Sequence, residues 1–454
     1  MTRTVRLSTF CVMAAAAITL GASADAPHVY AIKGARIVTA SGEAIPSGTI
    51  VLRNGVIDAV GAAVTVPGDA QVIEGAGLTV YPGLVDMGNS TGVEIPVPAA
   101  PPNIRTTDQA ERYKRTVIFR PDVDVASHVG DSADMARLAS AGITTVLAIP
   151  PAGIVKGQSA LVNVAGPVDE PQIGDVGDFR RGLQVVRASV ALHIDFGGSG
   201  PGGGRAAGYP VSLMGAISFV RQSFLDAQHQ RAVEGRYARV NTGPRPAYDP
   251  ALRALQPALD GKLPVAFQAD AAREIVRALE MAAQFKLDPV VTGGREADQV
   301  AADLKARNAR VIYSLNYPTR SRALPPDADE PIDALRARAH APRVPAALEK
   351  AGVLYAFSSA GLREARDFVR NAGRAVREGL SADAAVRALT INAARIAGAA
   401  DRLGSLEKGK IANVLVTEGD LFDERLRIRH VFIDGRMLAV EEPPQTPQRG
   451  RPGL

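Results

Sequence analysis

The middle of the chain, residues 81–402, alternates short apolar runs with amphipathic stretches. The apolar runs predict buried strands, and apolar positions three or four residues apart predict helices between them. Leu213, Ile217, Val220 and Phe224 follow this helical spacing. The alternation predicts an α/β fold, a (β/α)8 barrel of TIM type, with a doubly wound open sheet as the alternative. The expected strands are Leu84–Met87, Thr144–Ile149, Val190–Phe196, Pro264–Gln268, Pro289–Thr292, Arg310–Leu315 and Val353–Phe357.

The two ends of the chain carry a different pattern, in which short alternating runs are joined by tight turns. Asn54-Gly55 and Asp434-Gly435 each separate two such runs, and these dipeptides favour hairpin turns because both residues tolerate positive φ. We therefore expect residues 25–80 and 403–440 to form one small composite β-sandwich. Its predicted strands lie within Val29–Thr39, Thr49–Val60, Asn413–Thr417 and Arg429–Ile433.

Residues 1–24 have the pattern of a secretory signal peptide, with cleavage expected after Ala24. Its apolar run, Phe10–Leu20, is short for a membrane span, and an uncleaved anchor is the alternative. We expect a secreted or periplasmic protein without stable membrane insertion after cleavage. Cys11 lies inside this segment, so the cleaved chain would form no disulfide. Residues 441–454, rich in Pro, Gln and Arg, predict a disordered tail.

Composition narrows the choice of partners. The formal charge is +5 and the isoelectric point is near 9.3, but the Lys and Arg residues are spread along the chain. There is no Trp and aromatic residues make up 5%, which disfavours a base-stacking nucleic-acid surface. The Gly-rich segment Gly197–Gly208 lacks the spacing of a phosphate-binding loop, so a surface loop is favoured over a lid or a phosphate cradle.

Several motifs together resemble the amidohydrolase superfamily, in particular exported proteins like imidazolonepropionase or dihydroorotase. The motifs occur in the family's order and extend from about Val29 to Val440. The resemblance implies a barrel with a composite sandwich and hydrolysis of non-peptide C–N bonds, often in rings, by metal-activated water. The motifs are Ile32–Val38, Pro82–Asp86, Ala141–Val146, Gly157–Ala160, Leu389–Gly398 and Leu403–Lys410.

The metal ligands that this resemblance implies are missing from the matching positions. Histidines are expected at 88, 90 and 268 and within Val290–Gly294, and an aspartate within Tyr355–Ala360. The chain has Gly88, Ser90 and Gln268 at the first three positions, no histidine in Val290–Gly294, and Ser358 and Ser359 in Tyr355–Ala360. Neutral amides and hydroxyls are poor zinc ligands, so we expect the usual dinuclear mechanism to be absent. Lys156, which we expect in a loop, is not assigned as the family's bridging lysine.

Three residues remain as candidates for catalysis. Asp86 matches the family carboxylate at the end of the first strand, and its alternative role is a buried acceptor that fixes the backbone. His193 and Asp195 lie two apart and so share a strand face, where they could form an acid/base pair or ligate zinc at a relocated site. A histidine that is simply hydrogen-bonded within a strand is the alternative. No other cofactor is predicted.

Three hypotheses of function remain open. The first is an exported hydrolase of C–N bonds, which the resemblance implies. The second is a barrel that binds a small molecule without turnover, and the third is a subunit that pairs with an active paralogue or with itself. For the binding hypothesis the candidate ligand-binding residues are Asn89, Gln268, Asp270, Asn316 and Ser359.

Overall fold

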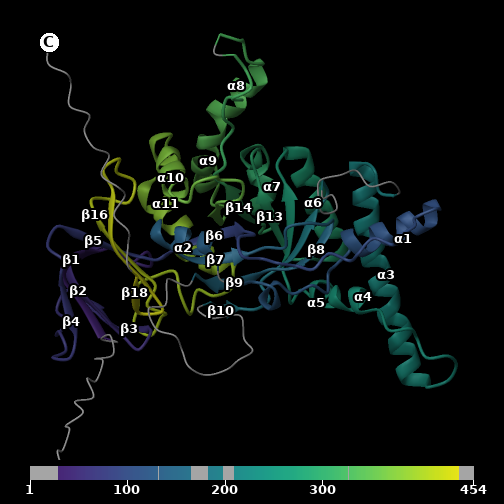
Figure 1. Ribbon diagram of the computed structural model, residues 1–454, viewed down its shortest axis with the longest axis horizontal. Coiled ribbons are helices and arrows are strands. Elements are labelled where there is room, and N and C mark those ends of the chain that lie inside the picture. Colours follow the sequence, from purple (N-terminus) through teal and green to yellow (C-terminus); the bar gives the residue numbers. More distant parts are fainter. Residues whose placement is uncertain (1–28, 131, 165–182, 198–208, 326, 439–454) are drawn as a thin grey trace, which may run out of the picture.

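The computed structural model describes residues 29–130, 132–164, 183–197, 209–325 and 327–438. The predicted signal peptide, the predicted tail and all but the first residue of the Gly-rich segment lie outside these residues. A sheet made from both ends of the chain stands at one side of the molecule, and the barrel with its helices extends from it (Figure 1).

The end sheet has eight strands in the order β18-β17-β16-β5-β1-β2-β3, with β4 paired to β1. β5 pairs antiparallel with β16, so the first and last parts of the chain are hydrogen-bonded side by side. The predicted association of the two ends in one β structure is therefore confirmed. The strands are β1 (Val29–Ile37), β2 (Ile45–Arg53), β3 (Val56–Gly61), β4 (Gln71–Glu74), β5 (Leu78–Pro82), β16 (Val414–Glu418), β17 (Arg427–Ile433) and β18 (Arg436–Leu438).

Both predicted hairpin turns occur in this sheet. Asn54 and Gly55 have φ of 51° and 81°, and Asp434 and Gly435 have φ of 51° and 73°. Positive φ at both central positions matches the twist of the flanking antiparallel strands. The two turns also lie against each other, because a Cβ on Gly435 would fall 2.9 Å from the Gly55 backbone.

The barrel strands form two ladders that share one connecting segment. One ladder has the order β10-β9-β7-β6, and the other has the order β15-β14-β13-β12-β11-β8. Every strand predicted for the barrel is present within a few residues of its expected bounds. The strands are β6 (Leu84–Asn89), β7 (Ile143–Ala148), β8 (Val155–Gln158), β9 (Ala160–Asn163), β10 (Gln184–Arg187), β11 (Leu192–Asp195), β12 (Val265–Ala269), β13 (Pro289–Gly293), β14 (Arg310–Ser314) and β15 (Tyr355–Ser358).

The segment from Val155 to Asn163 corrects one expectation, since Lys156 and Gly157–Ala160 were expected in a loop and the segment forms two consecutive strands. β8 pairs antiparallel with β11 and β9 pairs antiparallel with β7, so together they bridge the two ladders. Among the other barrel strands, β6 and β7 run parallel to each other and β11 to β15 run parallel to one another, whereas β10 pairs antiparallel with β9. Gly157 and two polar residues interrupt the apolar alternation of β8, which explains why the sequence pattern did not reveal a strand.

Helices cover the barrel, and among the described residues none is both long and apolar enough to span a membrane. The longest, α3, begins after Ser212, whose hydroxyl caps Gly215 N at 3.1 Å. The helices are α1 (Thr107–Ile118), α2 (Ala133–Ser140), α3 (Leu213–Val240), α4 (Pro250–Ala254), α5 (Gln256–Leu259), α6 (Ala272–Phe285), α7 (Ala301–Ala306), α8 (Ile332–His340), α9 (Val344–Ala351), α10 (Asp367–Arg377), α11 (Ala382–Leu389) and α12 (Ile391–Ile396), with short 3-10 turns at Val125–Ser127, Ala297–Val300 and Ala341–Arg343.

Each of several barrel strands contributes one or two apolar side chains to the barrel interior. These side chains form a single buried cluster, which also contains Ala393, Ala394 and Ile396 of α12. Because side chains alternate along a strand, the next inward position toward each carboxyl end lies at the barrel mouth. The strand residues of the cluster include Val85, Met87, Leu147, Leu161, Ala266, Val290, Ile312 and Ala356.

A buried polar network joins the barrel to the end sheet. Asn413 Nδ2 donates to Thr145 Oγ1 at 3.0 Å and to Asn163 Oδ1 at 2.9 Å. Its Oδ1 accepts from Asp434 N at 2.9 Å, and Asn163 Nδ2 donates to Asp434 Oδ1 at 2.8 Å. Buried polar groups that are bonded in this way fix the relative position of the two parts, because any shift leaves them unpaired.

Candidate functional site

A cavity of about 250 Å³ opens at the carboxyl ends of the barrel strands, and we call it the mouth cavity. Its floor is the layer of inward-facing residues directly above the apolar interior. This is the face at which barrel enzymes carry their active sites. The lining residues are Met87, Gly88, Ile149, Lys156, His193, Ile194, Gln268, Asp270, Thr292, Gly293, Arg295, Ile312, Ser314, Asn316, Ser358 and Ala360.

His193 is the most unusual group in this wall. Its side chain is buried, yet among the described residues its Nε2 has no hydrogen-bond partner. Burial, reinforced by the positive charge of Lys156, lowers the pKa of His193 to about 3. The ring is therefore neutral at physiological pH, and its free nitrogen can serve a molecule in the cavity. A buried polar atom left unpaired is costly, which favours a ligand as its partner.

An ion pair stands beside His193. Lys156 Nζ, from the antiparallel strand β8, lies 2.9 Å from Asp195 Oδ2 at the end of β11. Their side chains are only 16% and 20% exposed, so water screens the pair weakly. The register of β8 on β11 explains their meeting, since Ile194 lies opposite Val155. Lys156 lines the mouth cavity. Asp195 does not line it and contacts Lys156 through the ion pair.

The adjoining wall comes from β12, which pairs with β11, and from β13. Thr292 Oγ1 donates to Gln268 Oε1 at 3.0 Å, and Arg295 Nη2 lies 3.0 Å from Asp270 Oδ2. Gly293 has φ of 93°, and a Cβ there would lie 2.6 Å from Asp270 Oδ1 and 2.7 Å from Gln268 Nε2. A glycine is required at this position for both reasons, and it lets the strand end pass close to these two side chains.

Asp86 performs a different task from the one that its family position suggests. Among the described residues no backbone ladder joins β6 to β15, although the two strands are neighbours. Side chains make the connection instead: Asp86 Oδ1 accepts from Ser359 N at 2.7 Å and Asp86 Oδ2 from Ser359 Oγ at 2.5 Å. Ser358 Oγ donates to Gly88 O at 3.0 Å. We call these four residues the seam, because they close the barrel.

The Asp86 carboxyl is completely buried and receives two further donors. Asn89 Nδ2 lies 3.3 Å from Oδ2, and Gly88 N lies 3.2 Å from Oδ1. Burial raises the pKa of Asp86 to about 6, although the hydrogen bonds from Ser359, Asn89 and Gly88 work in the opposite direction. Desolvation therefore outweighs the hydrogen bonds, as expected for a carboxyl without a cationic partner.

The residues at the seam do not suit the metal centre that the resemblance implies. Both Asp86 oxygens are engaged by protein donors, and the neighbouring groups are hydroxyls and amides. A Cβ on Gly88 would lie 2.7 Å from Ser358 Oγ, so an imidazole at this position has no room. Within the described residues, no group of three or more His, Cys, Asp or Glu side chains is arranged to hold a metal ion.

The structure separates the predicted site residues into two groups. His193, Gln268, Asp270 and Asn316 line the mouth cavity. The others do not line it: Asp195 contacts Lys156, Asp86 and Ser359 belong to the seam, and Asn89 donates to both of these seam residues. Sequence reasoning missed Lys156 and Arg295. Lys156 could have been found if β8 had been identified as a strand beside β11.

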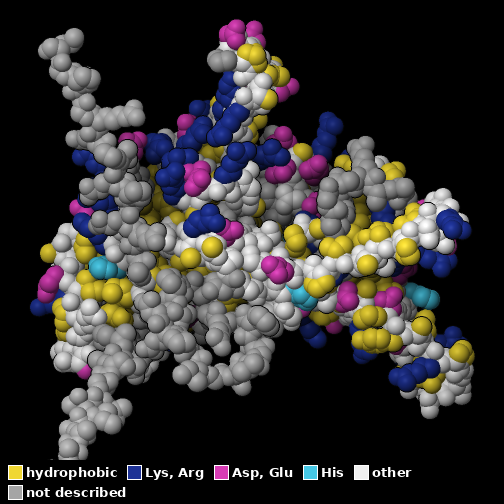
Figure 2. Space-filling model, in the orientation of Figure 1, with side chains coloured by type: hydrophobic (Ala, Val, Ile, Leu, Met, Phe, Trp, Pro, Cys, Tyr) yellow, Lys and Arg dark blue, Asp and Glu magenta, His cyan; other side chains and the backbone are white. Residues whose placement is uncertain are grey.

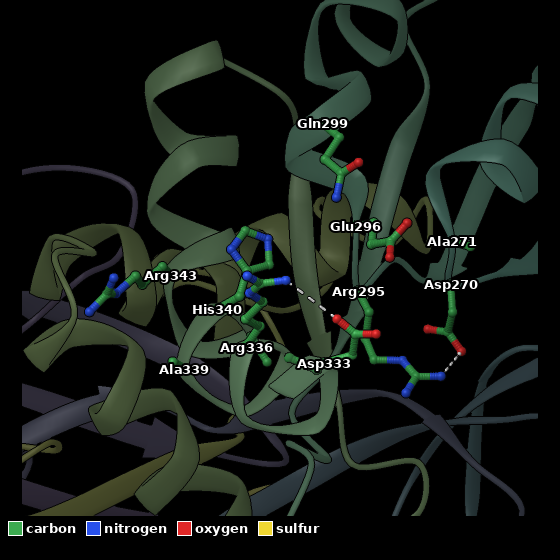
Figure 3. A pocket seen from close by; sticks show the side chains of 12 residues that line it. Asp270, Ala271, Arg295, Glu296, Gln299, Asp333, Arg336, Ala339, His340 and Arg343 are labelled. Carbon is green, nitrogen blue, oxygen red and sulfur yellow. Dashed lines mark hydrogen bonds and ion pairs between the residues drawn. The ribbon is translucent and has the colours of Figure 1, made fainter. Parts of the chain in front are cut away.

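A larger cavity of about 760 Å³ adjoins the mouth cavity, and we call it the outer cavity. Asp270 and Arg295 line both cavities, so their ion pair lies on the common wall. Figure 3 shows that pair on one side and residues of α8, including Arg336 and His340, on the other. The outer cavity is lined by Asp270, Ala271, Arg295, Glu296, Gln299, Asp333, Arg336, Ala337, Ala339, His340, Ala341 and Arg343.

The chain is similar to several proteins of known structure. An amidohydrolase from Thermotoga maritima MSB8 aligns with a TM-score of 0.71 at 21% identity, covering 90% of this chain and 99% of that one. A prolidase complexed with N-methylphosphonate-L-proline aligns with a TM-score of 0.53 at 18% identity, and a Xaa-Pro dipeptidase with bound methionine in its active site with 0.50 at 17%. Each covers 90% of this chain, and this chain covers 99% of each.

Sequence comparison gives a narrower match. Residues 263–438, from the start of β12 to the last strand of the end sheet, match the model of the amidohydrolase family. No curated protein matches the sequence. The structural similarities lie below 25% identity and so show the fold rather than the activity. The chain thus shares the fold of the Thermotoga maritima amidohydrolase, and its residues 263–438 match the amidohydrolase family.

Proposed function

We propose that this protein hydrolyses a non-peptide C–N bond in a small polar compound held in the mouth cavity. The family suggests hydrolysis of this bond type, and the cavity lies where a barrel enzyme would hold its substrate. A volume of about 250 Å³ is near the lower end for ligand pockets, which favours a compact substrate such as a small cyclic amide.

The unpartnered Nε2 of His193 is the observation that carries this proposal. A neutral imidazole in a buried wall can accept a hydrogen bond from an amide N–H or from water. Lys156, held by Asp195 at 2.9 Å, presents an ammonium group in the same wall. An ammonium beside the scissile carbonyl would stabilise the negative charge that develops on the carbonyl oxygen when water attacks. Asp195 would then act as a positioning residue.

In this proposal no step uses a metal-bound hydroxide, because the seam residues do not suit that centre. The ends of β6 and β15, where metal ligands would be expected, are instead joined by the hydrogen bonds between Asp86 and Ser359. We therefore propose that substrate polarisation, rather than metal activation of water, is the main contribution of this site to the reaction.

Binding without turnover is the second candidate, and one observation favours it. With a pKa of about 3, His193 is a weak base at neutral pH, whereas general bases work best near the operating pH. Gln268 and Thr292 are bonded to each other and offer only neutral groups. Such a wall could recognise a polar ligand without activating water.

One experiment separates the two candidates. The purified protein would be incubated with hydantoins, lactams and dihydropyrimidines, with products followed by mass spectrometry and binding by calorimetry. The hydrolase proposal predicts a product whose formation falls at least tenfold in His193→Ala and Lys156→Met. The control His229→Ala alters an exposed histidine on α3 and should leave the rate unchanged. Binding without product, lost in His193→Ala, would establish the second candidate instead.

We also propose that the protein is exported, with cleavage after Ala24, which lies outside the described residues. N-terminal sequencing of the protein recovered from the exported fraction tests this. Association with itself or with a paralogous subunit is a further proposal, and the molar mass in solution would report it.

A further inference from the structure

The Asp270–Arg295 ion pair lies where the mouth cavity and the outer cavity meet. It is the only pair of residues common to the walls of the mouth and outer cavities, as lined by the described residues. A molecule that extends from one cavity into the other must pass this pair. The adjoining volumes of about 250 and 760 Å³ leave room for such a molecule.

Arg295 has donors left to bind a second anion besides Asp270. Its contact joins one guanidinium nitrogen, Nη2, to one carboxylate oxygen at 3.0 Å. The Arg295 side chain is 53% exposed and that of Asp270 is 30% exposed. Exposed ion pairs contribute little to stability, so the fold does not depend on this one. A guanidinium has five donors in a planar fork, and a second carboxylate can therefore bind it along another edge.

Arg295 is the more available of the two cations in the mouth cavity wall. Lys156 is paired with Asp195 and its side chain is 16% exposed, whereas Arg295 is paired with Asp270 and its side chain is 53% exposed. Oδ1 of Asp270 is packed against Gly293, where a Cβ would lie 2.6 Å away, which restricts access for a cation. Lys and Arg side chains also gather around the base of α8 and over α9 and α10 (Figure 2). Arg336 and Arg343 line the outer cavity with side chains 73% and 63% exposed, and they pair with Asp333 and Glu378.

A turn of the backbone after β13 determines where Arg295 lies. Gly293 and Gly294 have φ of 93° and 68°, conformations that favour glycine, and they turn the chain as it leaves β13. Gly294 N donates to Ala269 O at 2.9 Å, which ties the turn to the end of β12. The turn thus fixes the backbone of Arg295 on the rim between the cavities, within reach of Asp270.

We infer that Arg295 is a specificity-determining residue that binds a carboxylate on the ligand. The polar head of the ligand lies against His193 and Lys156 in the mouth cavity, and its carboxylate reaches Arg295 at the common wall. This assignment rests on the proposed function for the location of the site, and it adds the class of ligand: a small amide-bearing acid.

Matched acids and amides test the assignment. The probes are 5-oxoproline with 5-oxoprolinamide, and hydantoin-5-acetate with hydantoin-5-acetamide, with affinities measured by calorimetry. The unaltered protein should bind each acid about tenfold or more tightly than its amide, because a charge-assisted pair replaces a neutral contact. Arg295→Gln should remove that preference and leave amide affinity within about twofold, and Arg295→Lys should be intermediate because it keeps charge but loses the fork.

Arg112→Gln is the matched control, because it removes an exposed Arg–Asp pair on α1 that lines neither cavity. It should leave both affinities unchanged. Equal binding of acid and amide, or an equal loss of both in Arg295→Gln, would overturn the assignment of Arg295 while leaving the proposed hydrolysis intact. Failure of every probe to bind would also overturn it. Loss of amide hydrolysis in His193→Ala is measured separately and reports on the proposed function alone.

Discussion

Replacing Asp86 by Asn should change how the stability of the protein depends on pH. Burial raises the pKa of this carboxyl to about 6, against 3.8 for an exposed aspartate. The native state therefore holds the proton more tightly than the unfolded chain does. The stabilisation that this gives is complete below about pH 4, decreases as the pH rises, and is lost above about pH 6. The pKa gap corresponds to about 3 kcal/mol.

His193 acts in the opposite direction over part of the same range. Its pKa falls from 6.5 to about 3 on folding, so its contribution to stability is present above pH 6.5 and lost as the pH falls toward 3. The wild-type profile alone therefore mixes two opposing effects. Subtracting the profile of Asp86→Asn from that of the wild type isolates Asp86, because His193 is present in both proteins.

The assay is urea unfolding at pH 4 to 7, followed by far-ultraviolet circular dichroism since the chain has no Trp. We expect the free energy of unfolding of the wild type, minus that of Asp86→Asn, to fall by about 2 kcal/mol from pH 4 to pH 7, most of the full value. A flat difference would refute the reasoning. A difference that rises with pH would mean that the carboxyl has a lowered pKa, as a metal-bound or ion-paired aspartate would.

Two further substitutions test the packing around the site. Gly88→Ala places a methyl group 2.7 Å from Ser358 Oγ and should lower the free energy of unfolding by about 1–3 kcal/mol in urea titrations. Adding Ser358→Ala to it should recover part of that loss, and no recovery would show that the clash lies elsewhere. Asn413→Ala removes two buried hydrogen bonds to the barrel and one within the end sheet and should cost about 3 kcal/mol, whereas an unchanged melting temperature would show that this network does not hold the two parts together.

The sequence predicted the fold well where one face of a segment is uniformly apolar. β6 and β12 to β15 are parallel strands buried on both faces, and such strands appear as nearly continuous apolar runs. The hairpins at Asn54-Gly55 and Asp434-Gly435 were equally clear, because few dipeptides tolerate their backbone angles. β8 was missed because three of its four residues, Lys156, Gly157 and Gln158, are polar or glycine. The strand forms because it pairs with β11, and its composition does not indicate it.

The site was only partly predictable for a related reason. Residues at the ends of strands could be located from the strand pattern, as the positions of His193 and Gln268 show. The direction of a side chain at an irregular strand end could not be predicted from that pattern. The register of β6 on β7 shifts between Asp86 and Asn89, and the Asp86 carboxyl is directed toward Ser359 of the seam instead of the cavity. Arg295 follows two glycines, so its reach to Asp270 depends on a turn that alternation does not encode.

Elemental analysis of the purified protein tests the central claim most directly, namely that hydrogen bonds of the seam take the place of a metal centre. We expect far less than one divalent ion per chain, and we expect a chelator to leave ligand binding and the unfolding midpoint unchanged. One or more tightly held ions per chain, lost together with activity in Asp86→Ala or His193→Ala, would contradict the claim.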